Sequence, residues 1–545
     1  MTSGVWQVTN QVPVLAGYDA FAADPVLPGI VSAFGADWAS ARLHDAGRTV
    51  GSARVQELAY LANRYSPELR AFDRFGNRID EIAFHPAWHE LMALASGQES
   101  HALAWTGPEP GAQVARAALQ YLWYGAESGI CCPISMTYAA VPVLRQDAAL
   151  WEQWGGLVTS NRYDPRQGAP QLKSGATVGT AMTETQGGSD LRQTHTVATD
   201  NRDGTYSLHG RKWFFSVPHS DVFLTLARTA EGISCFGVPG WLPDGTRNGV
   251  AIQRLKDKVG NRSNASSEVE FSGAIGRLIG EPGRGIRTGL SMNHNSRLDI
   301  AAASSGLMRM AVSLAAHHAQ HRRAFQKALI DQPIMQNVLA DLAIEAEAAA
   351  WLAFRLFAAL DRQETSESER LLARIGAPIA KYWITRRTPA VVTEAVECHG
   401  GNGFIEENPM ARLYREAPLN AIWEGSGNVI CLDLLRSLGR EAGSVDVLRA
   451  ELIAAAGADR RYDAALKRLE AELPAMIRNE GQARRLTEGL ALALQASLLL
   501  RFAPPAVADA FIATRLGAGW SGQFGDLPPA IDAAALARRA VPAVS

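Results

Sequence analysis

Cysteine is scarce in this chain, and the few cysteines form no recognisable motif. The 545 residues include five cysteines, without a CxxC pair. An odd and sparse set of cysteines indicates reduced thiols rather than a disulfide framework, so we expect a cytoplasmic protein. We interpret the adjacent Cys131 and Cys132 as small buried side chains rather than as metal ligands.

The chain also lacks a surplus of either charge and a long run of apolar residues. It has 53 Lys+Arg and 55 Asp+Glu, for a formal net charge of −2. This balance gives no global attraction to nucleic acid or to a membrane, although a local basic face is compatible with it. The first residues, MTSGVWQVTNQ, do not have the pattern of a signal peptide. Apolar runs such as 490–500 are too short to cross a bilayer, so no membrane partner is expected.

The pattern along the chain predicts several domains, as the length requires. Helix-like segments come first, and short β-rich runs separated by turn signals follow, which predicts an antiparallel sheet or barrel. Long amphipathic segments then predict a helical bundle. We therefore expect an α+β multidomain protein with a helical domain at 1–174, a β domain at 175–290, a helical bundle at 291–440 and a helical extension at 441–545.

A glycine-containing turn, AMTETQGGSD, lies where the helical patterns give way to strands. Gly187 and Gly188 permit a close approach of the backbone, and Thr183 and Ser189 supply hydroxyl groups. Exposed backbone N–H groups in such a turn can hold a ring edge or a phosphate. Composition alone favours the alternative of a solvated turn.

Three aromatic residues follow one another in RKWFFSVPHSD, at 211–221. Neighbouring residues of a strand face opposite sides, so one ring could cover a ligand while the next packs in the core. An aromatic cluster that only fills the core is the commoner case.

A single acid, Glu424, lies between Trp423 and a Gly-Ser-Gly run, directly before an apolar segment. An acid at a helix N-terminus is favourable by about 0.3–1 kcal/mol, but that interpretation leaves the tryptophan unexplained. A catalytic base beside a flat cofactor would explain both residues.

Two further patterns are similar to known motifs without matching them. The segment GAIGRLIGEPGRG at 273–285 has neither the spacing nor the βαβ context of a dinucleotide fingerprint. In FHPAWHE, His85 and His89 are four residues apart, but there is no HExxH pattern and no third ligand. We therefore predict no metal site.

Taken in order and spacing, these motifs resemble the acyl-CoA dehydrogenase superfamily of flavoproteins over essentially the whole chain. MTETQGGSD stands where the family usually has MTEPGAGSD, and RKWFFS stands at its KxWIT-type element. HRRAFQKALIDQPIMQ is similar to the RxxFGxxLxxxQ signature, with Gln326 in place of Gly. ECHGGNGF and IWEGSGN match the Gly-Gly and catalytic-Glu signatures. FHPAWH, KWFFSVP, LKDKVGNRSNASSEVEF and the helical extension resemble the AidB-type branch of the superfamily.

The resemblance implies FAD, bound between the β domain and the bundle of a homotetramer built as a dimer of dimers. Residues that would contact the cofactor within one subunit are Met182, Thr183, Gly187, Gly188, Ser189, Trp213, Phe214, Phe215, Ser216, Trp423, Gly425, Ser426 and Asn428. Residues that would reach the cofactor of a neighbouring subunit are Arg322, Phe325, Gly400 and Gly401.

The resemblance also implies a reaction. Glu424 aligns with the base that removes the α-proton of an acyl thioester while the flavin accepts the β-hydride. Burial against Trp423 and the flavin would raise the pKa of this acid and strengthen it as a base. We assign Arg297 a supporting catalytic role, and expect an acyl-CoA or another small hydrophobic molecule as substrate.

Two functions remain open at this point. AidB-type proteins are implied to respond to DNA alkylation, to bind double-stranded DNA through the C-terminal region, and to have weak isovaleryl-CoA-like dehydrogenase activity. The alternative is an ordinary FAD-dependent dehydrogenase of short or branched acyl-CoA with no DNA role. Residues 441–545 hold twelve Lys+Arg and twelve Asp+Glu, so a DNA face would require an asymmetric distribution of charge. Our candidates for contact with DNA are Arg436, Arg440 and Arg515, with Arg460, Arg461, Arg484 and Arg485 as further basic residues.

Overall fold

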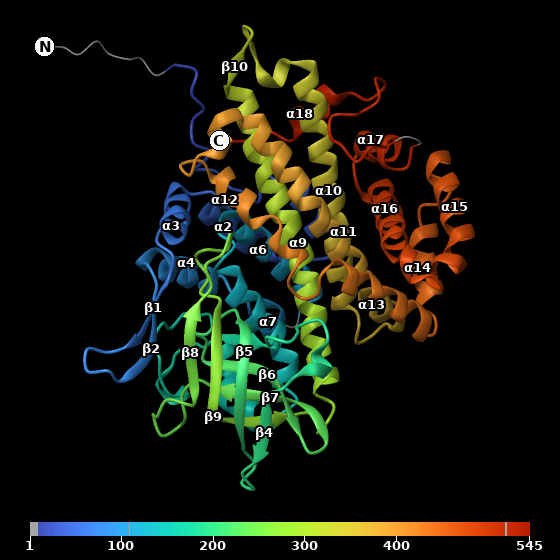
Figure 1. Ribbon diagram of the computed structural model, residues 1–545. Coiled ribbons are helices and arrows are strands. Elements are labelled where there is room, and N and C mark those ends of the chain that lie inside the picture. Colours follow the sequence, from blue (N-terminus) through green and yellow to red (C-terminus); the bar gives the residue numbers. More distant parts are fainter. Residues whose placement is uncertain (1–8, 108, 518–519, 545) are drawn as a thin grey trace, which may run out of the picture. The chain divides into compact units, whose positions relative to one another are not determined.

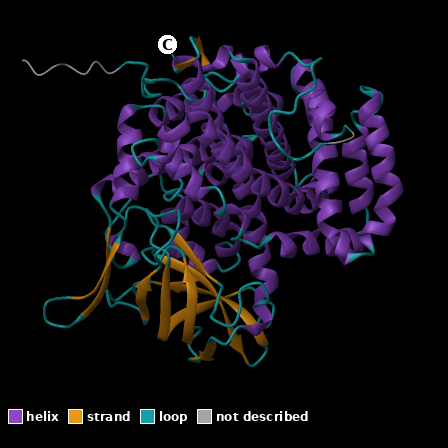
Figure 2. Cartoon of the chain, turned by 45° about the horizontal axis from the view of Figure 1, so that its top comes forward, coloured by secondary structure: helices purple, strands orange, loops and turns teal. Residues whose placement is uncertain are grey.

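The computed structural model describes residues 9–107, 109–517 and 520–544. The chain divides into two compact units. The sheet unit comprises residues 54–300 and 422–429, and the bundle unit comprises residues 1–53, 301–421 and 430–545. Figures 1 and 2 show the elements of both.

The sheet unit begins with helices and a two-stranded hairpin. Its helices are α3 (Ala53–Arg64), α4 (Pro86–Gly97), α5 (Leu103–Thr106), α6 (Ala112–Ala126), α7 (Cys131–Leu144) and α8 (Ala148–Val158). The hairpin joins β1 (Glu68–Phe72) to β2 (Arg78–Ala83) in antiparallel pairing. Local sequence sets these helix starts: Asp147 accepts a hydrogen bond from the backbone of Leu150, and Pro86 takes the first position of α4, where a missing N–H costs nothing.

A seven-stranded sheet forms the rest of this unit. Its strands are β3 (Val178–Ala181), β4 (Val197–Asp200), β5 (Tyr206–Phe215), β6 (Val222–Thr229), β7 (Gly232–Pro239), β8 (Val250–Leu255) and β9 (Ser267–Ile279). The order β3-β6-β4-β5-β9-β7 closes on itself through the pairing of β6 with β7, so the predicted barrel-like β domain is confirmed. The two pairs β3–β6 and β4–β6 are parallel, and the others are antiparallel. Phenylalanines from several strands fill the core.

The bundle unit is almost entirely helical. Its helices are α1 (Leu27–Ala33), α2 (Ser40–Val50), α10 (Pro333–Asp361), α11 (Glu367–His399), α12 (Pro409–Glu416), α13 (Gly427–Arg440), α14 (Ser444–Ile453), α15 (Arg460–Ile477), α16 (Ala483–Phe502), α17 (Pro505–Arg515) and α18 (Ala533–Arg539), with the short strands β10 (Arg323–Ala324) and β11 (Lys327–Ala328). Helix α10 packs against α11, α16 and α18, so the extension after residue 440 is part of the bundle. The expected order of helical, β and helical regions is thereby confirmed.

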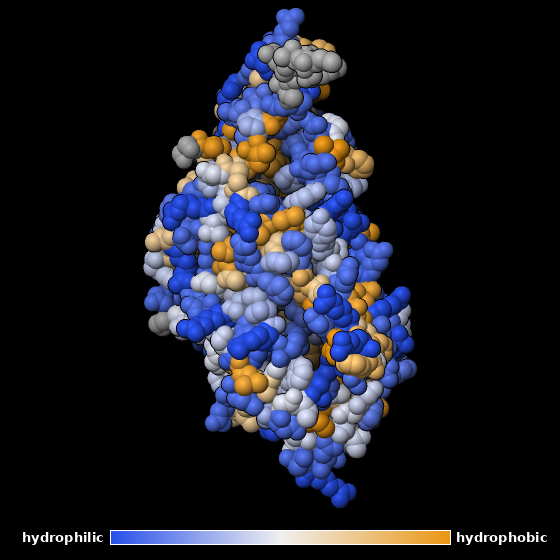
Figure 3. All heavy atoms as spheres, turned by 90° about the vertical axis from the view of Figure 1, so that its left-hand side faces the viewer, coloured by the Kyte–Doolittle hydropathy of each residue, from blue (hydrophilic) through white to orange (hydrophobic). Residues whose placement is uncertain are grey.

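The longest helix, α9 (Gly285–His321), is shared by the two units. Among the described helices it alone is long and apolar enough to cross a membrane, but 89% of its apolar stretch is buried within the protein. That burial is typical of a core helix. Figure 3 shows one face of the molecule, on which apolar side chains lie scattered among hydrophilic ones.

Ion pairs attach the extension to α10. Arg515 donates to Glu345 at 2.7 Å and also pairs with Asp341, and all three side chains are at most 2% exposed. Glu345 additionally accepts from Arg387 of α11 at 2.9 Å, and Arg539 of α18 pairs with Glu347. The acids of α10, unusual in an otherwise apolar helix, therefore neutralise arginines that come mainly from the extension.

Candidate functional site: the residues around Trp213 and Glu424

The turn after β3 is fixed to strand β5 by backbone and side-chain contacts. The N–H of Trp213 donates to the carbonyl of Thr183 at 2.9 Å. The neighbours of these two residues also pair: Lys212 Nζ donates to Glu184 Oε1 at 2.7 Å, and both side chains are nearly inaccessible to solvent. The sequence motifs MTETQGGSD and RKWFFS are thus held together, which places Thr183 beside Trp213.

Glu184 is the centre of a buried hydrogen-bond network. It also accepts from the N–H of His195 at 2.7 Å and from Thr196 Oγ1 at 2.6 Å. Burial alone would raise the pKa of Glu184, but the charge of Lys212 and these donors bring that pKa down to about 2. Burial lowers the pKa of Lys212, and its pairing with Glu184 opposes that effect. We did not predict this pair; the signal was a Glu and a Lys inside the two motifs.

The two glycines of the turn differ in what they require. A Cβ added at Gly188 would lie 2.7 Å from Thr183 Oγ1, so only glycine permits this approach. A Cβ at Gly187 would meet nothing within 4 Å, but its N–H and its carbonyl both pair with the backbone of Glu184, at 3.1 Å each. Met182 and Thr183 are half-buried, and Ser189 is exposed.

The three aromatic residues of β5 separate into two groups. Trp213 is half-buried and Phe214 is 48% exposed, so both can be reached by a ligand, and Ser216 is half-buried. Phe215 is fully buried and makes an edge-to-face contact with Phe223, with ring centroids 4.7 Å apart. Our prediction that Phe215 contacts the flavin is therefore corrected. A register shift between Lys212 and Phe215 breaks the strict alternation of the strand and turns both side chains inward.

A lysine that we did not predict lies over the accessible aromatic rings. Lys256 Nζ is 3.4 Å from the ring centroid of Trp213 and 4.8 Å from that of Phe214. It also donates to the buried carboxylate of Glu268 at 2.7 Å. This cation–π contact orients Trp213 and puts a positive charge beside the rings. The available signal was the lysine-rich segment LKDKVGN in one of the branch motifs.

The backbone at Glu424 is in an uncommon conformation. Its φ of +57° lies in the left-handed region, and Gly425 follows at +110°. Arg297 Nε, from α9, donates to the backbone carbonyl of Glu424 at 3.1 Å, so the structure brings the two predicted catalytic residues together. A non-glycine residue held in this region stores strain and is enriched at functional sites. Glu424 and Trp423 are both half-buried.

Helix α13 begins at Gly427, after Gly425 and Ser426. Ser426 and Asn428 are exposed, and Gly425 is half-buried. The free N–H groups of a helix N-terminus favour an anion such as a phosphate.

The predicted residues of the bundle unit lie on a hairpin and at the end of a helix. Phe325 and Gln326 form the two-residue turn between β10 and β11, with φ of +49° and +66°, and Phe325 is 92% exposed. Asn10 supports the base of this hairpin, because it exchanges two hydrogen bonds of 2.8 Å with the backbone of Arg323. The guanidinium of Arg322 donates to the Asn10 carbonyl.

Gly400 and Gly401 follow α11 and are exposed. A Cβ added at either residue would meet nothing within 4 Å, and Gly400 has a φ of +60°. Their backbone groups are accessible to a ligand or to another chain.

The three arginines that we predicted to contact DNA differ in their exposure to solvent. Arg436 and Arg440 are exposed near the end of α13. Arg515 is fully buried in its pairs with Asp341 and Glu345. A phosphate could reach it only by breaking these pairs, so our assignment of Arg515 to a DNA face is corrected.

The residues present fit a flavin nucleotide. Trp213 and Phe214 offer accessible aromatic surface, the hydroxyl of Thr183 can form a hydrogen bond, and the start of α13 suits a phosphate. Among the described residues, no group of His, Cys, Asp and Glu is arranged to hold a metal ion.

The comparisons with known proteins identify the family. Residues 10–165 match the family "Adaptive response protein AidB N-terminal domain", residues 179–274 match "Acyl-CoA dehydrogenase, middle domain", and residues 283–439 match "Acyl-CoA dehydrogenase, C-terminal domain". AidB of Escherichia coli (strain K12) is 45% identical over 511 residues, which are 93% of this chain and 94% of that protein. Acyl-CoA dehydrogenase family member 11 of Caenorhabditis elegans is 29% identical over 403 residues, which are 71% of this chain and 64% of that protein.

Solved structures show the same fold. The apo-form of Bd2924 is similar with a TM-score of 0.83 and 28% identity, over 91% of this chain and 100% of that one. ACDH-11 of Caenorhabditis elegans in complex with C11-CoA has a TM-score of 0.85 and 24% identity, over 96% of both chains.

Fold, site and comparisons together define an FAD-dependent oxidoreductase of the acyl-CoA dehydrogenase family. Within that family, the chain belongs to the AidB branch. The resemblance found in the sequence is thereby confirmed.

Proposed function

We propose that this chain is an AidB-like flavoprotein with weak dehydrogenase activity on small acyl-CoA thioesters of the isovaleryl-CoA type, and with Glu424 as the catalytic base. The observation that carries this proposal is the strained Glu424 backbone held by Arg297. Such strain persists only where the surrounding structure fixes it, as a general base requires.

The residues of the site have distinct tasks. The carboxylate of Glu424 accepts the α-proton of the thioester, and Arg297 helps to position Glu424 by donating to its backbone carbonyl. FAD, when bound, supplies the acceptor for the β-hydride. Met182, Thr183, Gly187, Gly188, Ser189, Trp213, Phe214, Ser216, Trp423, Gly425, Ser426 and Asn428 hold the cofactor in this proposal.

In this proposal, neighbouring subunits of a homotetramer, built as a dimer of dimers, complete the site. Phe325 supports this assembly, because at 92% it is the most exposed large apolar side chain among the described residues and lies at the tip of a hairpin that is braced at its base. A neighbouring subunit covers Phe325, and Arg322, Gly400 and Gly401 reach the cofactor of that subunit.

We also propose that the chain binds double-stranded DNA and serves in the cytoplasm in the response to DNA alkylation. Its match to a family named for adaptive response supports this role.

Arg436 and Arg440 form no ion pair within the described part of the chain, and the same holds for Arg460, Lys467, Arg468 and Arg478 on or next to α15. In contrast, Arg461 pairs with Asp459 and Asp509, and Arg485 pairs with Glu472. Cations without internal partners can neutralise DNA phosphates, and the release of the counterions bound to those phosphates then favours binding. An ordinary dehydrogenase without a DNA role is the alternative.

The base is tested by Glu424→Gln, which keeps the size of the side chain and removes its charge. We expect the FAD-loaded variant to keep its flavin spectrum and to lose flavin reduction by isovaleryl-CoA by about 10²–10⁴-fold under anaerobic conditions. Glu407→Gln makes the same change on an exposed side chain and serves as the control. If the Glu424 variant is reduced as fast as wild type, Glu424 is not the base.

A further inference from the structure

Three cations share a single acid on strand β9 of the seven-stranded sheet. Glu268 accepts from Lys256 at 2.7 Å, from Arg254 at 2.7 Å and from Arg211 at 2.8 Å. Burial would raise the pKa of Glu268, but the hydrogen bonds from these three side chains bring that pKa down to about 2. Glu268 is therefore ionised at neutral pH, and the four side chains together hold three positive charges and one negative charge.

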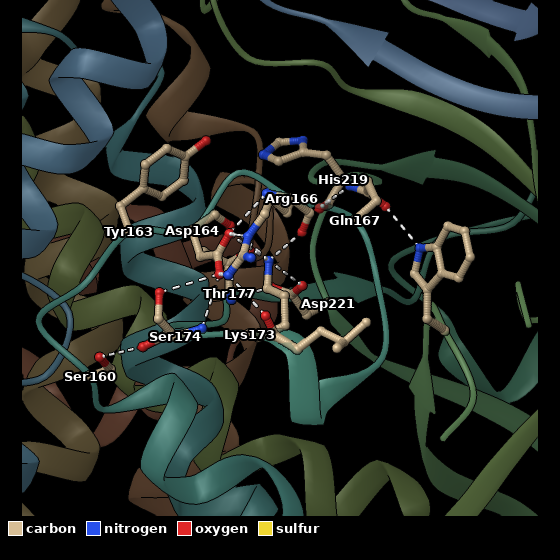
Figure 4. A network of polar contacts seen from close by, with 12 residues as sticks. Ser160, Tyr163, Asp164, Arg166, Gln167, Lys173, Ser174, Thr177, His219 and Asp221 are labelled. Atoms are coloured by element: carbon tan, nitrogen blue, oxygen red, sulfur yellow. Dashed lines mark hydrogen bonds and ion pairs between the residues drawn. The ribbon is translucent and has the colours of Figure 1, made fainter. Parts of the chain in front are cut away.

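A second charged network of the sheet unit is balanced, by contrast. Figure 4 shows this network, in which Lys173 pairs with Asp221 at 3.0 Å. Arg166 pairs there with Asp164 at 2.6 Å, so two cations meet two acids. None of the three cations at Glu268 pairs with another acid within the described part of the chain, so their group keeps an excess of positive charge.

Lys256 is the most buried of the three cations. Its side chain is 12% exposed, whereas those of Arg211 and Arg254 are 52% and 63% exposed. Water and salt screen an exposed charge far more than a buried one. The charge of Lys256 therefore acts on its surroundings more strongly than the charge of either arginine.

The backbone places Lys256 beside the rings that we assign to the flavin. Lys256 lies directly after β8, and its N–H donates to the carbonyl of Ser266 at 2.7 Å. Strand β9 pairs with β8 on one side and with β5 on the other, so the side chain reaches the end of β5 across β9. Its Nζ lies 3.4 Å from the ring centroid of Trp213 and 4.8 Å from that of Phe214.

A positive charge at this place acts on the charge that a flavin gains when it is reduced. The oxidised flavin ring is neutral. A ring that has accepted a hydride, which is two electrons and one proton, carries one negative charge at neutral pH. In the proposed reaction this hydride comes from the β-carbon of the thioester. A fixed cation in a partly desolvated site stabilises the anionic ring and leaves the neutral ring almost unaffected.

We propose that Lys256 raises the reduction potential of the bound flavin, by holding a positive charge against Trp213 and Phe214 that stabilises the anionic, reduced ring. The inference rests on the proposed function, because it requires the flavin to lie against these two aromatic rings. It gives Lys256 a task separate from that of the base Glu424: Lys256 sets how favourable hydride acceptance is.

The test is an anaerobic measurement of the reduction potential of the full FAD-loaded chain against a reference dye, with xanthine and xanthine oxidase as the source of electrons. We expect Lys256→Met to lower the equilibrium constant for flavin reduction about tenfold, which is about 30 mV for a two-electron couple. Lys256→Arg keeps the charge and should retain most of the wild-type potential. Arg254→Met removes one charge from the same acid on an exposed side chain, so it should shift the potential less.

The flavin absorbance of the same samples separates an altered potential from a lost cofactor. Glu268 keeps both arginines in Lys256→Met, so we expect this variant to hold FAD as wild type does. If it does not, Lys256→Gln repeats the measurement with a neutral hydrogen-bond donor. Loss of FAD from both variants would overturn the proposal, because Lys256 would then serve binding rather than the potential.

The proposal is also overturned if Lys256→Met has the wild-type potential, if Lys256→Arg falls as far as Lys256→Met, or if Arg254→Met shifts the potential as much. Each of these results leaves Glu424 and the flavin site as proposed, because the electrons come from xanthine oxidase and not from an acyl-CoA. A wild-type chain that takes up no FAD would overturn the proposed function as well.

Discussion

Single residues around β5 fix the geometry of the proposed flavin site. Glu184 and Lys212 join two segments that are distant in sequence, and Lys256 orients Trp213. Buried pairs of this kind contribute little net stability but become costly when one partner is lost, because the other charge remains buried. The proposed site therefore depends on side chains outside the set that we assign to the flavin.

Lys212→Met tests this dependence. We expect it to lower the free energy of unfolding by about 3–5 kcal/mol, because Glu184 stays buried without its cation. The double variant Lys212→Met/Glu184→Gln should recover much of that loss, which chemical denaturation and FAD occupancy together can measure. Equal losses in the single and double variants would contradict the account.

The same pair predicts a pH dependence. The pKa of Glu184 in the folded chain is about 2, below its ordinary value of 4.5. A depressed pKa contributes stability that is fully present above pH 4.5 and is lost as the pH falls toward 2. The difference in stability between wild type and Glu184→Gln should therefore shrink over that interval.

At the scale of elements, sequence periodicity predicted where strands and helices lie, but it did not predict which way each side chain points. The β-rich runs gave the sheet, yet the register shift in β5 sent Phe215 into the core, and a shift of this kind is decided by pairing with β9 rather than by local sequence. Likewise, we predicted Arg515 to be a surface cation. The acids that pair with it in the interior are on α10, about 170 residues earlier in the chain. Contacts between elements that are distant in the chain could not be predicted from the sequence.

The β10–β11 hairpin carries a prediction about assembly. Phe325→Ser removes the exposed apolar tip and leaves the braced base intact, so each subunit should fold while the proposed tetramer weakens. Light scattering across a dilution series should show dissociation at higher concentration than for wild type, together with lower FAD occupancy. Val259→Ser, at another exposed apolar position, is the control. An unchanged dissociation curve would remove Phe325 from the subunit interface.

For the whole molecule, the order of helical, β and helical regions and the flavoprotein motifs were predictable from the sequence, because each motif contains its own glycines, hydroxyls or acid. A cavity of the sheet unit that Phe84, Tyr163 and His219 help to line was not, since its walls come from five separate segments. His85 and His89, four residues apart, proved to have structural contacts: His85 caps α4, and His89 bonds Tyr163.

DNA binding is a property of the whole charge distribution and can be measured as such. Arg436→Ala/Arg440→Ala should reduce the slope of log K against log salt for duplex DNA by about 2, since each phosphate contact contributes roughly 0.9. Arg461→Ala/Arg485→Ala removes the same charge from side chains that are already paired, so its slope should change less. If wild type does not bind duplex DNA at low salt, the DNA role is excluded.

The most direct test of the central claim is the visible absorption spectrum of the purified chain after incubation with FAD and removal of the free cofactor. The account predicts a flavin spectrum at one FAD per chain, lost when Trp213 and Phe214 are both replaced by alanine. A colourless protein that takes up no FAD would contradict it.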